Sequence, residues 1–219
     1  AVSFNTVVQG SVLTAVNGLW TFNAAQKPDG VYTITATAQD LAGNTTPAAN
    51  FLVVTIDSTI PGAPTITGFS ADSGVVGDRI TNDNTLSITG TADPNCTVTV
   101  SFNGVADGTA TPDSSGNWTY NANSKPDGVY TITSRCDDPA GNRSGNSTPI
   151  VVTIDSTAPG APTITGYSTA TGTPGDGITA DATLVITGTA EPNCIVTVSF
   201  NGTPSGTTTA DSSGNWTIN

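Results

Sequence analysis

The sequence contains no histidine, which removes the commonest catalytic base. Ser-His and Cys-His nucleophile pairs are therefore impossible, so hydrolases with such triads are excluded. It has no glycine-rich phosphate loop leading into a helix, and its acidic residues fall in turns rather than along a groove that a glycosidase would need. No apolar run approaches the ~20 residues of a membrane-spanning helix. We therefore expect a protein that is not an enzyme and that has no membrane insertion in this segment.

Basic residues and glutamate are also scarce. Five Lys and Arg face 17 Asp and Glu, the net charge is −12, and Glu191 is the only glutamate. Such a charge repels nucleic acid and anionic membrane surfaces and attracts cations. Nucleic acid is excluded as a partner, and the excess of Asp over Glu indicates turns rather than helices.

The residues that are abundant favour β-structure. Thr, Ser, Asn, Val and Ile dominate, and 24 Gly and 14 Pro interrupt the chain at short intervals. Helix-forming residues are few by comparison. The composition predicts an all-β protein.

A long internal repeat organises the chain. Shifting the sequence by 98 residues aligns Trp20, Trp118 and Trp216 without a gap, and 46 of the 65 residues from Asp57 to Asn121 recur from Asp155 to Asn219. Such self-similarity indicates tandem copies of one domain. The predicted domains are the C-terminal part of a first repeat (1–56), a complete repeat (57–154) and the N-terminal part of a third (155–219).

Within the complete repeat, short alternating runs lie between turn clusters, which is typical of a sandwich of about seven strands. The expected strands are Pro64–Phe69, Leu86–Thr91, Thr97–Phe102, Gly108–Pro112, Asn117–Tyr120, Gly128–Arg135 and Pro149–Ile154. Trp118 is expected in the core, since one Trp at a fixed strand position per repeat is what a sandwich interior supplies. The predicted fold class is all-β, with tandem immunoglobulin-like β-sandwich domains in Greek-key topology.

Three blocks of the complete repeat carry a resemblance to a known family. The runs TGTADPNCTVTV, SSGNWTYN and KPDGVYTITSRCDDPAGN, closed by VVTIDSTAPGAPTI, resemble the bacterial Ig-like repeats of giant adhesins exported by type I secretion. Related blocks at Lys27–Asn44 and Gly188–Val198 extend the resemblance over the whole chain. The resemblance implies an extracellular or cell-surface location, a spacer role between neighbouring repeats, and calcium at the domain junctions.

Acidic residues near the junctions are candidate calcium ligands. In Ig-like topology the linker, the TADPN segment and the DDPAGN segment meet at one pole, and hard oxygen ligands suit Ca²⁺. The candidates of the complete repeat are Asp57, Asp93, Asp137, Asp138 and Asn142. The other repeats supply Asp155, Glu191 and Asp40, while Asp72, Asp78 and Asp83 form a second candidate group.

The same acids have an alternative interpretation without a cation. Asp in loops commonly accepts backbone N–H groups of its own turn, and this interpretation accounts for Asp29 and Asp127 in Pro-Asp-Gly turns. At the pole itself, Arg135 and Arg143 could supply the positive charge that the carboxylates need. Asp29 and Asp127 could also face the next junction from the domain before it.

Two cysteines of the complete repeat are placed for a disulfide. Cys96 begins one predicted strand and Cys136 ends another, and in an Ig sheet these strands are antiparallel neighbours. An extracellular setting permits the bond. The alternative is two buried thiols, because Ala38 stands at the Cys136 position of the first repeat.

Two other functions stay open beside the spacer. The repeats themselves could bind a host or surface ligand, a glycan or a protein, or copies of the chain could assemble laterally into an extracellular filament. An exposed aromatic patch would favour ligand binding. The incomplete terminal repeats motivate the assembly hypothesis.

Overall fold

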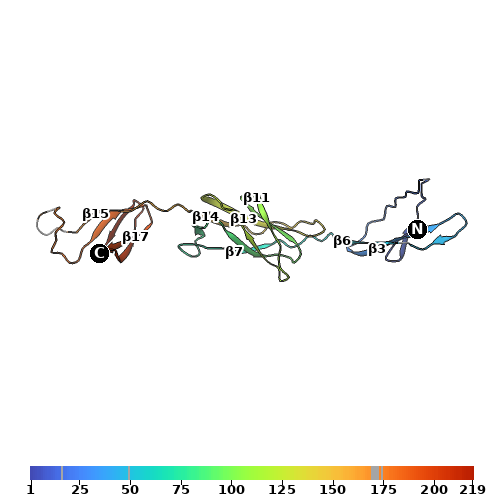
Figure 1. Ribbon diagram of the computed structural model, residues 1–219, viewed down its shortest axis with the longest axis horizontal. Coiled ribbons are helices and arrows are strands. Elements are labelled where there is room, and N and C mark those ends of the chain that lie inside the picture. The colour runs from blue at the N-terminus through green and yellow to red at the C-terminus, as the bar shows by residue number, and fades with distance from the viewer. Residues whose placement is uncertain (16, 49, 169–172, 174) are drawn as a thin grey trace. The chain divides into compact units, whose positions relative to one another are not determined.

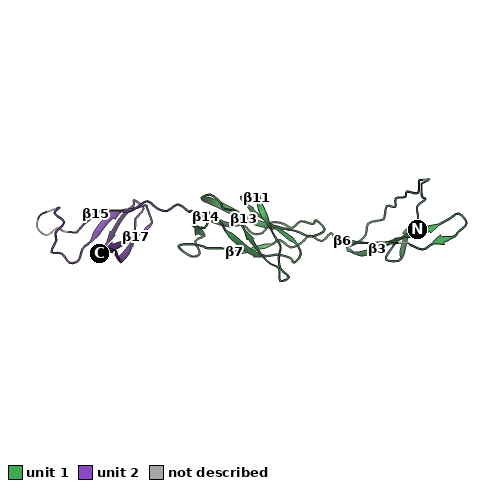
Figure 2. Ribbon diagram, in the orientation of Figure 1, with its two compact units in different colours: residues 1–156 green, residues 157–219 purple. Residues whose placement is uncertain are grey.

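The computed structural model describes residues 1–15, 17–48, 50–168, 173 and 175–219, and all of its regular elements are strands (Figure 1). It divides into two compact units, Ala1–Ser156 and Thr157–Asn219 (Figure 2). A search of the described residues for a helix that could cross a membrane finds none. The all-β, tandem Ig-like fold class is confirmed.

The complete repeat is a sandwich of two sheets. One sheet has the order β12-β9-β7, with strands Asn117–Asn121, Ser87–Thr91 and Thr65–Phe69. The other has the order β11-β10-β13-β14-β8, with strands Val105–Ala110, Thr97–Phe102, Gly128–Asp137, Ile150–Ile154 and Ile80–Thr81. Side chains of both sheets form one buried cluster, which makes this repeat a closed domain.

The remaining strands form open sheets from the two partial repeats. Residues 1–56 contain a sheet β2-β1-β3-β6 and a short pair β4-β5, and the second unit contains the sheets β15-β16-β19 and β17-β18. Their bounds are Val2–Phe4 (β1), Val7–Gly10 (β2), Gly30–Ala36 (β3), Ala38–Gln39 (β4), Thr45–Thr46 (β5), Phe51–Ile56 (β6), Thr163–Tyr167 (β15), Ile186–Thr189 (β16), Ile195–Phe200 (β17), Thr203–Thr209 (β18) and Asn215–Ile218 (β19).

Alternation along the strands creates the core of the complete repeat. In β12, Trp118 and Tyr120 are buried while Asn117, Thr119 and Asn121 are exposed, as the period of two predicts. The predicted core position of Trp118 is confirmed, since only 2% of the residue is exposed. Trp216 occupies the same position in the second unit with 3% exposed.

One expected strand is misplaced. The prediction of a strand at Gly108–Pro112 is wrong by three residues, because β11 starts at Val105 and forms a hairpin with β10. The connection is a two-residue turn in which Asn103 and Gly104 both have positive φ, 50° and 78°. Asn-Gly is the preferred pair for such tight hairpins, so this dipeptide holds β11 against β10.

A two-residue strand, β8, has no counterpart among the expected strands. It pairs in parallel with β14, with Ile80 opposite Thr153 and Thr81 opposite Ile154. Two residues are too few for a hydrophobic period to be detected. The Thr81 side chain is buried, and its hydroxyl donates to the carbonyl oxygen of Ala71, so β8 is fixed to the loop before it.

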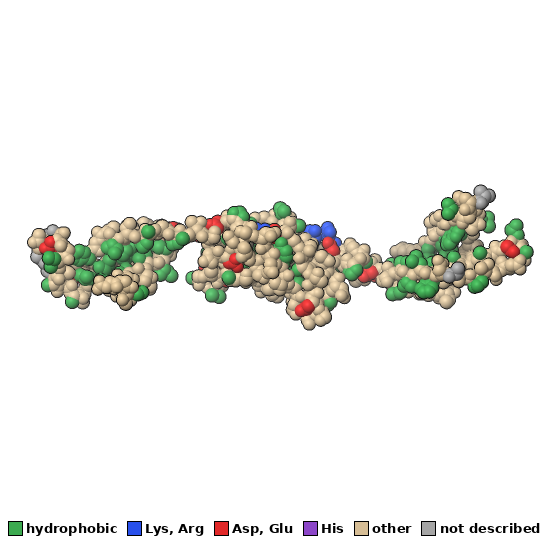
Figure 3. All heavy atoms as spheres, in the orientation of Figure 1, with side chains coloured by type: hydrophobic (Ala, Val, Ile, Leu, Met, Phe, Trp, Pro, Cys, Tyr) green, Lys and Arg blue, Asp and Glu red, His purple; other side chains and the backbone are tan. Residues whose placement is uncertain are grey.

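The partial repeats leave apolar surface open. Figure 3 shows apolar side chains exposed over residues 1–56 and over the second unit. Phe200 is 49% exposed and Trp20 is 47% exposed, whereas their equivalents in the complete repeat, Phe102 and Trp118, are 6% and 2% exposed. The equivalent residues are therefore buried in the complete repeat, where both sheets have all their strands.

Candidate functional site at the repeat junctions

The start of the first linker is held by a carboxylate from the preceding repeat. Asp29, in the Pro-Asp-Gly turn before β3, accepts hydrogen bonds from Ser58 N (3.0 Å), Ser58 Oγ (2.7 Å) and Thr59 Oγ1 (2.9 Å). The Ser58 hydroxyl, with help from Thr59, lowers the pKa of Asp29. The interpretation of Asp29 as a residue that caps only its own turn is wrong, since these donors lie about 30 residues away.

The second junction repeats this arrangement 98 residues later. Asp127 accepts hydrogen bonds from Ser156 N (2.9 Å) and Ser156 Oγ (2.6 Å). Ser156 is the residue equivalent to Ser58. We name the contact of Asp29 or Asp127 with the following Ser the upstream anchor of the linker.

The far end of each linker is held by the next repeat. Asp93 accepts a hydrogen bond from Gly62 N at 2.7 Å, and in the second unit Glu191 accepts one from Gly160 N at 3.3 Å. Asn142 donates its side-chain amide to the carbonyl oxygen of Asp57 at 3.0 Å. We name the contact of Asp93 or Glu191 with the linker glycine the downstream anchor.

The loops with sequence Asp-x-Ala-Gly-Asn are closed by their own aspartate. Asp138 accepts from Ala140 N (2.9 Å), Asn142 N (2.8 Å) and Asn142 Nδ2 (2.9 Å), and Asp40 makes the same contacts with Ala42 and Asn44. The asparagine amide is the main cause that lowers the pKa of each carboxyl. These two predicted ligands therefore stabilise their own loops.

The remaining candidate ligands have other contacts. Asp137 forms a two-bond ion pair with Arg143, whose Nε and Nη2 lie 2.6 and 3.1 Å from its two oxygens. Asp57 accepts a hydrogen bond from Thr59 N at 3.0 Å, and the backbone N–H of Asp155 donates to Thr81 O at 2.9 Å. Arg143 therefore pairs with Asp137 and, among the described residues, makes no hydrogen bond to Asp57, Asp93 or Asp138.

The candidate ligands have oxygen atoms that could bind calcium, but these atoms do not converge on one position. Among the described residues, no three Asp, Glu or Cys side chains gather as a metal group. Asp93 and Asp138 accept hydrogen bonds from N–H groups. Asn142 points its amide nitrogen at the linker, whereas an asparagine that binds calcium would point its amide oxygen at the ion. As folded here the residues do not form a calcium site, and calcium binding stays a prediction.

Acid should weaken these carboxylate contacts. Hydrogen bonding lowers the pKa of Asp29, Asp40 and Asp138 below the ordinary 3.8, so their contribution is present above that value and is lost as pH falls through the lower folded pKa. We expect a melting temperature that is constant from about pH 7 to about pH 5 and that falls below about pH 4. Circular dichroism melts over this range check it, and a decline that is complete by about pH 5 would contradict it.

The two cysteines of the complete repeat lie across neighbouring strands. Cys96 precedes β10 and Cys136 lies in β13, both are buried, and the structure joins them in a disulfide with a Cα–Cα distance of 5.9 Å. The strand register places Val98 opposite Cys136. Cys194, the equivalent of Cys96 in the second unit, is a free cysteine.

Family models match almost the whole chain. A model described as a bacterial Ig-like domain matches residues 1–58 and again 59–156, and a second, described as a bacterial Ig-like domain (group 3), matches residues 115–213. The chain belongs to the bacterial Ig-like domain family. Such domains are typically non-catalytic structural modules and usually belong to extracellular or surface proteins. No curated protein matches the chain.

A half-buried ion pair in this bacterial Ig-like repeat was not foreseen from the sequence. Lys125, in its Lys-Pro-Asp-Gly turn, contacts the Asp107 carboxylate, while the other oxygen of Asp107 accepts from the Tyr120 hydroxyl at 2.9 Å. The Lys125 ammonium also lies 4.9 Å from the centre of the Phe102 ring. Burial, together with Asp107, raises the pKa of Tyr120 to about 12. The sequence carries one signal of this contact, which is that lysine recurs 98 residues earlier as Lys27. In the structure Lys27 likewise contacts Gln9 and lies over the ring of Phe4.

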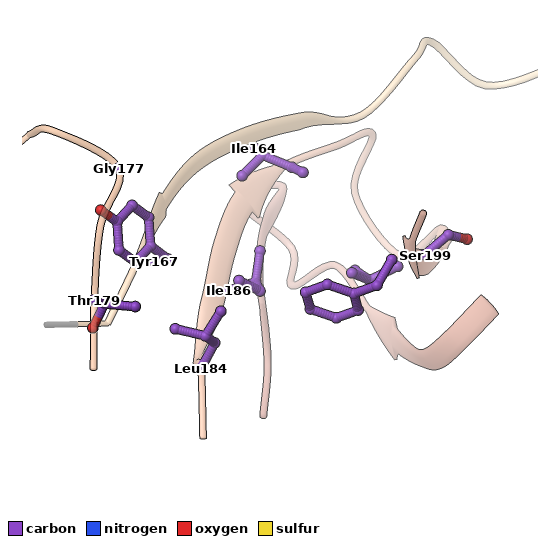
Figure 4. A pocket seen from close by; sticks show the side chains of 9 residues that line it. Ile164, Tyr167, Gly177, Thr179, Leu184, Ile186 and Ser199 are labelled. Carbon is purple, nitrogen blue, oxygen red and sulfur yellow. The ribbon is translucent and has the colours of Figure 1, made fainter. Parts of the chain in front are cut away.

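An apolar groove of the second unit is the inner face of its sheets. Ile164, Tyr167, Leu184 and Ile186 line it together with the side chain of Phe200 (Figure 4). The equivalents of Leu184, Ile186 and Phe200 are core residues of the complete Ig-like repeat, with at most 6% exposed. The groove is therefore lined mainly by residues of a domain core, with Thr179 and Ser199 as the hydroxyl side chains of its lining.

Proposed function

We propose that this chain is an extracellular structural spacer of a bacterial surface adhesin, in which tandem Ig-like repeats hold a distal domain away from the cell. The observation that carries the proposal is the pair of anchors on each linker. The upstream anchor is Asp29 or Asp127, and the downstream anchor is Asp93 or Glu191. A linker with both ends hydrogen-bonded suits a spacer better than a flexible tether.

The linker sequence adds to this restriction. Pro61, between the anchors, and Pro64, two residues after them, fix φ near −65° and donate no backbone hydrogen bond, so the linker has little freedom. Ser58 and Gly62, which receive the two anchors of the first linker, lie four positions apart. The segment that is free to bend is therefore only a few residues long.

Calcium is the finer part of the proposal. The carboxylates of Asp57, Asp93 and Asp138, together with Asn142, are the residues that would hold it, at the cost of some N–H contacts described above. What supports it is the presence of several carboxylates near the junction and the net charge of −12. When bound, the ion would neutralise these acids and tie the linker to the loops on its downstream side.

Small-angle scattering with matched variants tests the spacer. We expect Asp29→Ala combined with Asp127→Ala to reduce the maximum dimension of the 219-residue chain, because both upstream anchors are lost. The control is Asp113→Ala combined with Asp211→Ala, which removes the same charge from turns that bond only within themselves. Equal dimensions for the two double variants would overturn the role of the upstream anchors.

The same scattering measurement and a thermal melt, each made in millimolar calcium and in chelator, test calcium binding. A melting temperature and maximum dimension that both fall in chelator would support calcium binding at the junction. If neither changes, calcium has no part in the mechanism, and the anchors alone must account for any extension. A wild-type chain that is compact in both conditions would overturn the spacer itself.

Lateral assembly is the second candidate, and one observation favours it. Val129 and Val151 lie on the outer face of the β13–β14 pair and are 61% and 46% exposed. Their equivalents Val31 and Val53 are 61% and 51% exposed, so an apolar pair recurs with the repeat. A scattering mass that rises above that of one chain with concentration would support assembly, and a constant mass would remove it.

A further inference from the structure

We propose that the complete repeat is a load-bearing module, in which the parallel β8–β14 pair resists pulling and the Cys96–Cys136 disulfide limits how far the repeat extends once that pair breaks. The inference rests on the proposed spacer function, because a spacer transmits force from one terminus of each repeat to the other. It assigns that force to particular hydrogen bonds.

The β8–β14 pair bonds the last strand of the repeat to β8, the strand that follows the first one, β7. Thr153 N donates to Arg79 O at 2.9 Å, and Asp155 N donates to Thr81 O at 2.9 Å, on either side of the Ile80–Thr153 and Thr81–Ile154 pairs. β14 is the last strand of the repeat, and on its other edge it pairs with β13. The chain leaving the repeat is thus bonded to a strand from near its beginning.

The geometry loads these bonds together. When the two termini are pulled apart, β14 is drawn from its C-terminal end, and β8 is drawn from its N-terminal end once the strand before it, β7, has been pulled off β9. Because the strands are parallel, they must slide along each other, and the hydrogen bonds share the load. An antiparallel hairpin pulled from its open end would instead lose its bonds one at a time.

β8 is fixed to the repeat by side chains as well. Thr81 is 1% exposed and its hydroxyl donates to Ala71 O, while Asn82 N donates to Ser73 Oγ at 2.8 Å. The load on β8 therefore passes into the folded loop. Residues 178–179 of the second unit are the equivalents of β8, and they form no strand there. The described sheets of that unit also have no equivalent of β14. We infer that β8 forms because it pairs with β14.

The disulfide shortens the chain that force can release. After the pair breaks, chain is drawn out from both ends until it reaches Cys96 and Cys136, which are 40 residues apart in sequence and covalently joined. The residues between them cannot extend. At about 3.6 Å per residue, the bond withholds roughly 14 nm of contour length.

Single-molecule force spectroscopy on the full chain, held by enzymatic tags at its termini, tests the disulfide. We expect the unfolding step of the complete repeat to lengthen by roughly 14 nm in reductant, and the Cys96→Ala, Cys136→Ala double variant to show the long step without reductant. Cys194→Ala, the control, should keep the wild-type step. A step that neither reductant nor the double variant changes would overturn the limiting role.

Two proline variants test the parallel pair. Thr153→Pro removes the N–H that bonds to the carbonyl oxygen of Arg79. Val151→Pro, one pleat away on the same edge of β14, removes an N–H that bonds to no carbonyl of the described residues. At fixed force Thr153→Pro should unfold roughly tenfold faster than Val151→Pro, the factor that one hydrogen bond contributes. Equal rates would overturn the assignment.

An isosteric variant covers the case in which proline prevents folding. Thr81→Val keeps the shape of the side chain and removes the bonds of its hydroxyl to Ala71 O and Asp83 N. It should also unfold faster at fixed force than wild type, and an unchanged rate would place the resistance elsewhere even if neither proline variant folds. Scattering at zero force reports on the spacer independently, so a failure of this proposal and a failure of the spacer are distinguishable.

Discussion

Replacing Cys96 and Cys136 together with alanine is expected to lower the free energy of unfolding of the complete repeat by about 4 kcal/mol. The bond closes a loop of 40 residues, and its removal restores that loop's freedom to the unfolded chain. Alanine suits both sites because they are buried and a serine hydroxyl would need a partner. Urea unfolding of the full chain, followed by circular dichroism, measures the change.

The natural sequence offers a reference for this experiment. The first repeat carries Ala38 where the complete repeat has Cys136, so alanine is compatible with the strand. Cys194→Ala is the control, since Cys194 is a free cysteine of the second unit and its replacement should leave the unfolding of the complete repeat unchanged. A loss below about 1 kcal/mol for the double variant would show that the bond does not constrain the unfolded chain.

Most strands of the sandwich could be predicted because they follow a local period. The bounds of β10 were predicted without error, and β12 and β13 begin where expected, at Asn117 and Gly128. Alternating Val, Trp and Tyr mark these strands. The errors fall at strands whose position does not depend on the hydrophobic period. The Asn103-Gly104 turn places β11, and β8 forms through its pairing with β14.

The junction was harder to predict because its contacts are long-range. The sequence places Asp57, Asp93 and Asp138 near one pole, and the structure connects each of them to the linker or its loop. Nothing local distinguishes an aspartate that closes its own turn, such as Asp113, from Asp29, which holds a linker about 30 residues away. Both lie in turns before Gly or Ser, and only the fold brings Ser58 to one of them.

Gly90→Ala is expected to destabilise the complete repeat by about 3 kcal/mol or more, through overpacking rather than backbone strain. A Cβ at Gly90 would lie 2.0 Å from Thr65 O and 2.4 Å from Cζ2 of Trp118. The carbonyl belongs to β7, which pairs with β9 at this point, and the indole fills the core. Neither neighbour can move without breaking a sheet or a packed core.

Gly145→Ala is the matched control, because a Cβ there meets nothing within 4 Å and the residue has no positive φ. The unfolding midpoint of each variant in urea gives the comparison. The second unit repeats the arrangement, with a Cβ at Gly188 lying 2.0 Å from Thr163 O and 2.2 Å from Trp216. The Gly–Trp pair is therefore one device that allows a large aromatic ring to lie flat on the middle strand of a three-stranded sheet. If Gly90→Ala were as stable as Gly145→Ala, Trp118 would have to leave this position, and a change in its fluorescence would show it.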